Sequence, residues 1–223
     1  MKKVITLAAL MFASVAAMSQ TQYGIRAGMT LSTYHSAQSI YQFKPGIHIG
    51  GVADIPIGSS KFSFVPGIYF ADKGTQTKGS FPLTPINSFV PFDEYTFEGT
   101  HRNYQLEIPL LFTYRIPVNE NFTLKPQIGA FVSYTVFGRI NEERKYVNAV
   151  TTPPPFPMDY YFYDGNCLGF GGNAGVSAVC NGYSFTVSCD VGYNNRPNTV
   201  SDFLYSDSNA PDICILFSLG YDF

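Results

Sequence analysis

Ionisable side chains recur at alternate positions along the chain, and their types suit an internal network of ion pairs. The candidates are Arg26, His48, Asp54, Glu107, Arg115, Lys125 and Asp190, and Lys44 and Asp222 follow the same alternation. Both signs of charge are present, so pairing can offset the cost of removing these groups from water, whereas an unpaired member would be strongly destabilising. The pattern predicts a structural network filling a narrow polar interior. A narrow proton or ion path is the alternative.

Histidines and glycines give little support for catalysis. His35, His48 and His101 are spread over separate segments and form no metal-binding or nucleophile motif. The glycines of residues 169–174 superficially match a dinucleotide fingerprint, which requires a strand before it and a helix after it. These glycines lie inside an alternating segment, where a close backbone approach explains them better. We therefore predict no enzyme activity, no cofactor and no metal.

Four cysteines also lack a metal-binding spacing. They are Cys167, Cys180, Cys189 and Cys214. If residues 181–182 form a two-residue turn, Cys180 faces Tyr183 and Cys189 faces Ala174 across the hairpin, so no disulfide follows from the register. Free thiols are the prediction, and a bond between Cys167 and Cys214 stays open.

Bulky apolar and small polar residues alternate after residue 20, which is typical of β-strands with two different faces. Residues 213–223 show it most clearly, since Ile, Ile, Phe, Leu, Tyr and Phe occupy one parity. Eight strands are predicted at residues 23–32, 44–55, 62–73, 104–114, 122–136, 168–180, 183–193 and 213–223. Short turns at 56–61, 117–121 and 181–182 alternate with long loops at 33–43, 74–102, 138–166 and 194–211. Short turns at one rim and long loops at the other are typical of outer-membrane barrels.

The amino-acid composition distinguishes a membrane barrel, whose outer surface is apolar, from a soluble barrel, whose outer surface is charged. Only 13% of the 223 residues are charged, against roughly 25% in an average soluble domain. A soluble barrel of the lipocalin type, the alternative, needs a charged exterior, whereas Gly, Ser and Thr dominate the polar parity and suit a narrow interior. A net charge of −2 gives no footprint for nucleic acid. We predict an all-β, eight-stranded antiparallel up-and-down transmembrane β-barrel.

The first residues look like a secretory signal. Lys2 and Lys3 precede an apolar run over residues 4–16, and small residues at positions 17 and 19 precede a cut ahead of Gln20. The run is shorter than the roughly 20 residues that a membrane-spanning helix needs. The prediction is a signal peptide at residues 1–19 and one outer-membrane barrel domain at residues 20–223 with four long external loops.

Three segments resemble recurrent strands of the PorT-like outer-membrane β-barrel proteins. They are YGIRAGMTLS at 23–32, FVPGIYF at 64–70 leading to Lys73-Gly74, and LEIPLL at 106–111. The resemblance implies a small barrel in the outer membrane of a Gram-negative bacterium, a family whose members often have no assigned role. PorT itself is tied to protein secretion, so a component assisting transport or secretion is the alternative function. The Cys residues and the two long aromatic loops lie outside the shared pattern.

The C-terminus resembles the signal that the barrel-assembly machinery reads, with Phe217, Leu219, Tyr221 and Phe223 at alternate positions. That machinery is therefore an expected partner during biogenesis, and outer-membrane lipid and lipopolysaccharide are expected around the finished barrel.

The long loops carry the candidates for external binding, namely Phe92, Tyr95, Phe97, Tyr160, Tyr161 and Tyr163. They predict either a cap of loops packed on one another or a contact surface for an extracellular protein or glycan, because Tyr-rich patches make large rigid contacts. We expect a non-catalytic barrel with a plugged polar lumen and a structural or surface-interaction role. A lipid A-modifying enzyme that recruits His35, Ser36 or His101 is a further alternative.

Overall fold

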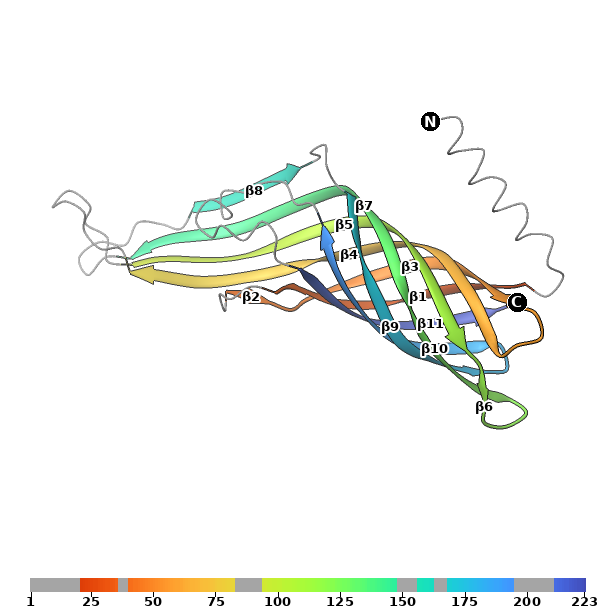
Figure 1. The fold of residues 1–223 in the computed structure, drawn as a ribbon. Coiled ribbons are helices and arrows are strands. Elements are labelled where there is room, and N and C mark those ends of the chain that lie inside the picture. Colours follow the sequence, from red (N-terminus) through yellow and green to blue (C-terminus); the bar gives the residue numbers. More distant parts are fainter. Residues whose placement is uncertain (1–20, 36–39, 83–93, 148–155, 163–167, 195–210) are drawn as a thin grey trace, which may run out of the picture.

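A computed structural model describes residues 21–35, 40–82, 94–147, 156–162, 168–194 and 211–223 (Figure 1). These residues form eleven strands: β1 (Gln22–Tyr34), β2 (Tyr41–Gln42), β3 (Lys44–Pro56), β4 (Phe62–Pro82), β5 (Glu94–Tyr114), β6 (Ile116–Pro117), β7 (Phe122–Val147), β8 (Phe156–Phe162), β9 (Leu168–Cys180), β10 (Tyr183–Asn194) and β11 (Asp212–Asp222). Within the described ranges, no helix is both long and apolar enough to cross a membrane.

Eight long strands close into a ring. The order is β1, β3, β4, β5, β7, β9, β10 and β11, and β11 pairs back with β1, every neighbour being antiparallel. The predicted eight-stranded up-and-down barrel is therefore confirmed. Closure matters because a backbone group left unpaired in lipid costs several kcal/mol, and a ring leaves no free strand edge.

The two faces of the ring have the predicted polarity. Phe185, Phe217 and Leu219 point outward with 47%, 38% and 67% of their surface exposed, whereas the intervening Thr186 and Ser218 are buried in the interior. Outward aromatic residues gather at both rims, including Tyr23, Phe62, Tyr114, Tyr183 and Tyr221 at the short-turn rim, and Phe70, Tyr134 and Tyr193 at the opposite rim. An apolar exterior between two aromatic rims is the surface that a lipid bilayer requires.

The short turns and the C-terminus lie together at one end of the barrel (Figure 1). Asn181 and Gly182 have φ values of 50° and 84°, which are the positive values that a two-residue hairpin turn demands and that Asn and Gly adopt most readily. This turn sets the register in which Cys180 faces Tyr183 and Cys189 faces Ala174, as predicted.

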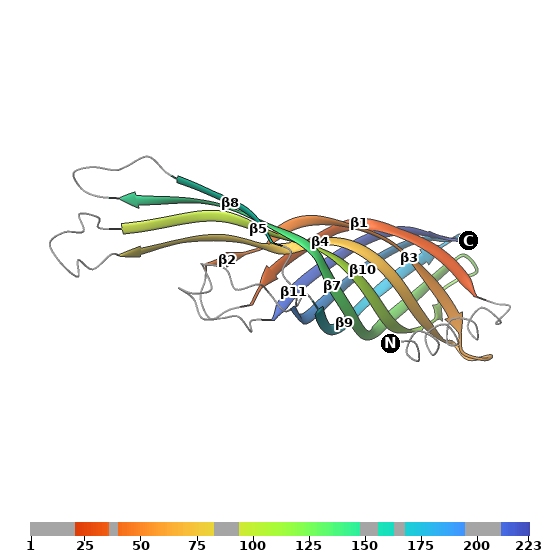
Figure 2. The same cartoon turned by 90° about the horizontal axis from the view of Figure 1, so that it is seen from above.

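Three strands continue well past the other end of the barrel (Figure 2). The pairing of β4 with β5 runs to Pro82↔Glu94, that of β5 with β7 to Glu94↔Val147, and β8 adds to the outer part of β7. We call residues 75–82, 94–103, 138–147 and 156–162 the external sheet. Segments 74–102 and 138–166 were expected to be loops, so much of their length differs from that expectation. The cause is that both faces of the external sheet carry polar residues, which removes the apolar alternation by which a strand is recognised.

Candidate functional site: the polar lumen and the external sheet

Lys73 lies in the lumen and joins a carboxylate of the neighbouring strand β5 to one of β10, on the far side of the ring from β4. Its Nζ donates to Glu107 Oε2 at 2.5 Å and to Asp190 Oδ2 at 2.8 Å. Asn173 Nδ2 donates in turn to Asp190 Oδ1, and the Lys73 ammonium lies 5.0 Å from the centroid of the buried Phe131 ring. Strands β4, β5, β7, β9 and β10 therefore meet through one buried cluster that blocks the barrel axis.

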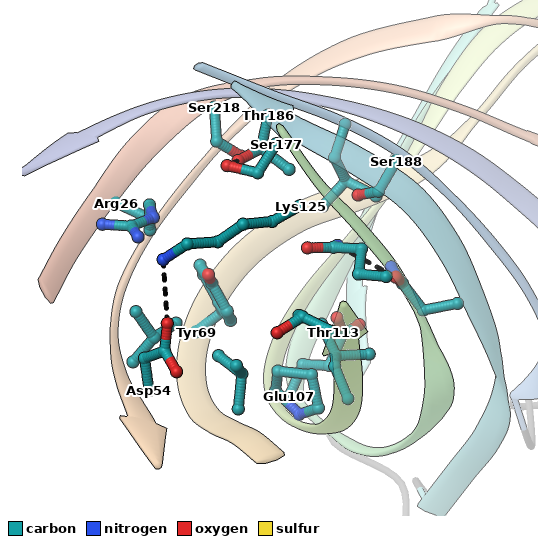
Figure 3. A pocket seen from close by; sticks show the side chains of 17 residues that line it. Arg26, Asp54, Tyr69, Glu107, Thr113, Lys125, Ser177, Thr186, Ser188 and Ser218 are labelled. Carbon is teal, nitrogen blue, oxygen red and sulfur yellow. Dashed lines mark hydrogen bonds and ion pairs between the residues drawn. The ribbon is translucent and has the colours of Figure 1, made fainter. Parts of the chain in front are cut away.

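A second cluster lies nearer the short turns (Figure 3). Asp54 accepts hydrogen bonds from Arg115 Nη2 and Lys125 Nζ, each at 2.8 Å, and Arg26 pairs with Asp222. Arg26, Asp54 and Lys125 line a cavity of about 60 Å³, whose wall also includes Ser177, Thr186, Ser188 and Ser218. The space is sufficient for very few waters, so this part of the barrel is no open pore.

The lumen is also closed at the external mouth. Lys44 Nζ donates to Asp72 Oδ1 at 2.6 Å, and the backbone carbonyl of Asp72 accepts from Thr30 Oγ1 at 2.8 Å. Asn103 of β5 reaches across to the hydroxyl of Tyr34 on β1 at 2.9 Å. Strand β4 leaves its partner β3 at this level, where Gly74 has a φ of 137°.

The lumen pairs balance in formal charge. Five cations, Arg26, Lys44, Lys73, Arg115 and Lys125, pair with five carboxylates, Asp54, Asp72, Glu107, Asp190 and Asp222. All seven lumen candidates from the sequence face the interior. His48 is the one candidate held by a hydroxyl, with Nε2 and Ser218 Oγ 2.8 Å apart.

Three important lumen residues escaped the sequence reasoning. Lys73 and Asp72 stand at the end of the predicted third strand, where a change to loop was expected, and Phe131 is a large side chain at a parity otherwise occupied by small or polar residues. A signal for Lys73 existed, because the inward parity of Ser63, Tyr69 and Ala71 continues through Lys73 and Thr75. No such indication exists in the sequence for Asp72, because its position in the alternation predicts an outward-facing side chain. Asp72 is buried only because β4 separates from β3 at this point.

The described residues that could support catalysis or metal binding lie in separate parts of the fold. His35 is exposed at the end of β1, whereas His101 is buried in the external sheet, and Ser36 lies outside the described residues. Among the residues that the structure describes, no group of three His, Cys, Asp or Glu side chains could hold a metal ion. Cys180, Cys189 and Cys214 are free thiols, and Cys167 lies outside the described ranges.

The external sheet has an outward face that is polar and hollowed. A cavity of about 760 Å³ lies over strands β4, β5 and β7, and its wall includes Gln76, Lys78, Thr96, Glu98, Asn141 and Glu143. Exposed ion pairs cross this face, with Lys78 Nζ 3.0 Å from Glu98 Oε2 and Lys145 Nζ 2.8 Å from Glu143 Oε1. Such a surface offers a polar ligand both hydrogen-bond donors and acceptors, and both positive and negative charges.

The opposite face of the external sheet is buried. Phe97 and Ile140 lie in it beside His101 and Glu142. Burial by itself would raise the pKa of Glu142, but Arg144, whose Nε donates to Glu142 Oε1 at 2.5 Å, and His101, whose Nε2 lies 3.8 Å from Oε2, outweigh burial and lower this pKa overall. This face therefore packs as a small core outside the barrel.

The aromatic candidates for external binding divide accordingly. Phe97 lies in strand β5, is 5% exposed, and is one of the residues lining the cavity over the external sheet. Tyr95 is half-buried and stacks with Phe97 at a centroid distance of 6.1 Å. Phe92 and Tyr163 lie outside the described residues, and of Tyr160 and Tyr161 only the backbone, in β8, is described.

A closed eight-stranded ring with an apolar exterior and an ion-paired interior defines a small transmembrane β-barrel. The sequence matches the family described as outer membrane protein beta-barrel domain over residues 12–194, and the chain belongs to this family. It is accordingly a protein of the Gram-negative outer membrane. No match was found among curated proteins.

Solved structures with a similar fold include outer-membrane barrel proteins. Neisserial surface protein A is 12% identical, with a TM-score of 0.45, and the match covers 90% of this chain and 97% of that protein. Ail, the attachment invasion locus protein of Yersinia pestis, is 11% identical with a TM-score of 0.41, covering 91% and 98%, and a further structure of Ail holds the heparin analogue sucrose octasulfate. OprG from Pseudomonas aeruginosa is 10% identical with a TM-score of 0.39, covering 91% and 95%.

Proposed function

We propose that this protein acts without catalysis as a surface-interaction protein, in which the barrel anchors the external sheet and the sheet contacts an extracellular protein or glycan. The observation that carries the proposal is the contrast between a closed lumen and a hollowed external face. The described lumen residues are joined by buried ion pairs, whereas the external sheet carries a polar cavity of about 760 Å³.

The chemistry of the hollow indicates the kind of partner. Its wall combines the hydroxyls of Thr96 and Thr100, the amides of Gln76 and Asn141 and the exposed Lys78–Glu98 pair. Hydrogen-bonding groups of this mixture suit saccharide hydroxyls or a polar protein loop better than an apolar ligand.

The binding test uses the full chain folded in micelles. It is applied to an array of neutral and acidic glycans and to a panel of purified extracellular matrix proteins. We expect saturable binding to one class, and a loss of about tenfold or more when Thr96→Arg and Asn141→Arg place two bulky charges in the hollow. The control is Asn119→Arg in the exposed turn at the opposite end of the barrel, which should leave binding unchanged. Equal binding by both variants would contradict the proposed site.

The resemblance to PorT-like barrels supports a second candidate, a component that assists protein secretion. A secretion partner would cover the external sheet in the intact cell. Protease treatment of intact cells distinguishes the two functions: cleavage within residues 152–164 supports an exposed interaction surface, and complete protection supports a covered component. A shift in lipid A mass on deletion of the gene would instead favour an enzyme.

A further inference from the structure

The short turns at the C-terminal end of the barrel differ in polarity. The turn between β9 and β10, residues 181–182, is polar and adjoins the rim residue Tyr183 directly. The connections from β3 to β4 and from β5 to β7 instead carry the exposed side chains of Ile57, Ile116 and Val118. Figure 1 shows the second of these connections, which includes β6, projecting at this end of the barrel. Exposed apolar side chains that lie together mark an interaction surface.

Ile116 and Val118 continue the outward face of β5. The pair Ile116↔Leu124 keeps the register in which β5 pairs with β7, and Val118 N donates to Phe122 O at 2.9 Å. Since alternate residues of a strand share a face, Ile116 and Val118 lie on the same side of the sheet as Tyr114. The lipid-facing surface of the barrel therefore extends into this hairpin.

Ile57 joins the same surface from the neighbouring turn. Its N–H donates to Phe62 O at 2.9 Å, and Phe62 is the register partner of Tyr114, with the two rings 4.9 Å apart. Arg115 N donates to Lys61 O at 2.8 Å, which joins the two turns through the backbone. We give the name apolar extension to Ile57, Phe62, Tyr114, Ile116 and Val118.

The backbone of the β6 hairpin is paired, and its tip is polar. The N–H groups of Val118 and Asn119 donate to Phe122 O, and Asn121 N donates to Asn119 Oδ1. Asn119, Glu120 and Asn121 are exposed at the tip. Because an unpaired backbone group is costly in an apolar environment, a paired hairpin with a polar tip suits the boundary between hydrocarbon and water.

The apolar surface is taller along β5 than along β10. On β10 the outward apolar positions run from Tyr183 to Tyr193, which is about 34 Å along the strand and about 24 Å across the membrane at a tilt of about 45°. On β5 and its continuation they run from Tyr104 to Val118, which is about 48 Å along the strand and about 34 Å across the membrane. The apolar band of an outer-membrane barrel is about 25 Å tall, so the apolar extension adds about 10 Å on one side.

We propose that the apolar extension binds phospholipid of the periplasmic leaflet and thereby holds the barrel at a tilt in the outer membrane. Short turns face the periplasm in such barrels, and the apolar extension is continuous with the surface that faces lipid. Its five side chains are far fewer than the roughly 20–30 residues that a stable protein interface uses on each side, which favours lipid over a protein partner. Lys61, which is exposed beside these residues, adds a cation for the phosphates of the headgroups.

The tilt follows from the unequal height of the apolar surface. A bilayer accommodates an apolar surface that is longer than its hydrocarbon core by tilting the protein. The apolar extension lies at the opposite end of the barrel from the external sheet, so this inference does not depend on the proposed function.

The first test uses tryptophan fluorescence, since the chain contains no tryptophan of its own. Val118→Trp and its matched control Glu120→Trp are each folded into phosphatidylcholine vesicles whose acyl chains carry bromine close to the headgroup. We expect bromine to lower the fluorescence of Val118→Trp by at least about twofold and that of Glu120→Trp by less than about a tenth, because the first side chain lies in lipid and the second in water. Quenching of Val118→Trp no stronger than that of Glu120→Trp would overturn the proposal and leave the apolar extension to a periplasmic protein.

The second test introduces no aromatic residue and measures the tilt of the barrel by polarised infrared spectroscopy of oriented bilayers. Ile116→Ser/Val118→Ser should reduce the angle between the barrel axis and the membrane normal, whereas Asn119→Ser/Glu120→Gln should leave it unchanged. An unchanged angle in the first variant, or an equal change in both, would also reject the proposal. Heat-modifiable gel migration checks that each variant is folded, and Val118→Ser alone replaces the first double variant if that one does not fold.

Discussion

The lumen and the external sheet contain the same kinds of ion pair in opposite surroundings. In the lumen, Lys73 and Asp190 expose only 6% and 3% of their side chains, whereas Lys78 and Glu98 of the external sheet expose 60% and 69%. Water screens the external pairs and rearranges around them when they break. In the lumen, bulk water does not take the place of a lost partner, so an ion pair that loses one member leaves a buried, uncompensated charge. The free-energy cost of such a charge favours a single arrangement of the lumen ion pairs.

The largest effect is expected for Lys73→Met. This change leaves Glu107 and Asp190 buried without their common cation, which should lower the free energy of unfolding by about 3–5 kcal/mol. Urea unfolding of the protein in lipid vesicles, followed by gel migration, measures the loss. The triple variant Lys73→Met/Glu107→Gln/Asp190→Asn, which removes all three charges, should recover most of it. A loss below 1 kcal/mol in the single variant would mean that the lumen resembles the external sheet after all.

A second prediction tests the boundary between the two regions on one strand. Ile108→Arg places a charge in the middle of the apolar band of β5 and should lower stability by about 2–4 kcal/mol. Thr100→Arg lies on the same outward face beyond the band and should change it by less than about 0.5 kcal/mol. Unfolding in lipid vesicles compares the two variants. Equal effects would show that the apolar band of β5 does not end between Ile108 and Thr100.

A third, smaller effect concerns acid. The pKa of Glu142 is lowered in the folded protein, so its contribution is complete above the unfolded value of about 4.3 and is lost as the pH falls through the folded value. Hydrogen exchange, corrected for intrinsic rates, should show the external sheet losing protection between pH 5 and pH 3 while the barrel strands keep theirs. Glu142→Gln should remove most of this difference. Asp159→Asn should remove less, because Asp159 is exposed although Arg139 also lowers its pKa. Equal acid sensitivity in both regions would refute the assignment.

The smallest effect is expected for Lys78→Gln. The exposed Lys78–Glu98 pair should contribute less than about 0.5 kcal/mol to local stability, and the contribution should fall further in high salt. Hydrogen exchange of residues 94–103 measures it in low and high salt. A loss comparable to that of Lys73→Met would show that burial is not what separates the two regions.

The sequence by itself determined the ring of eight strands and the polarity of its two faces. The alternation of apolar and polar residues indicates which side chains face the lipid. The lengths of the connections indicate which strand ends lie at the same end of the barrel. For the same reason it placed Arg26, Asp54, Glu107 and Asp190 in the lumen, because parity alone settles inward or outward orientation.

Only the tertiary structure decided which charges pair and where the strands end. The contact of Lys73 with Glu107 and Asp190 joins residues 34 and 117 positions apart along the chain, and the curvature and stagger of the closed ring set that proximity. The external sheet was likewise not predicted from the sequence, because its strands have polar residues on both faces and so lack the regular alternation of apolar and polar residues. The opposition of Arg102 and Arg139 depends on the register shift between β5 and β7 near Tyr104, a backbone irregularity that no residue pattern announces.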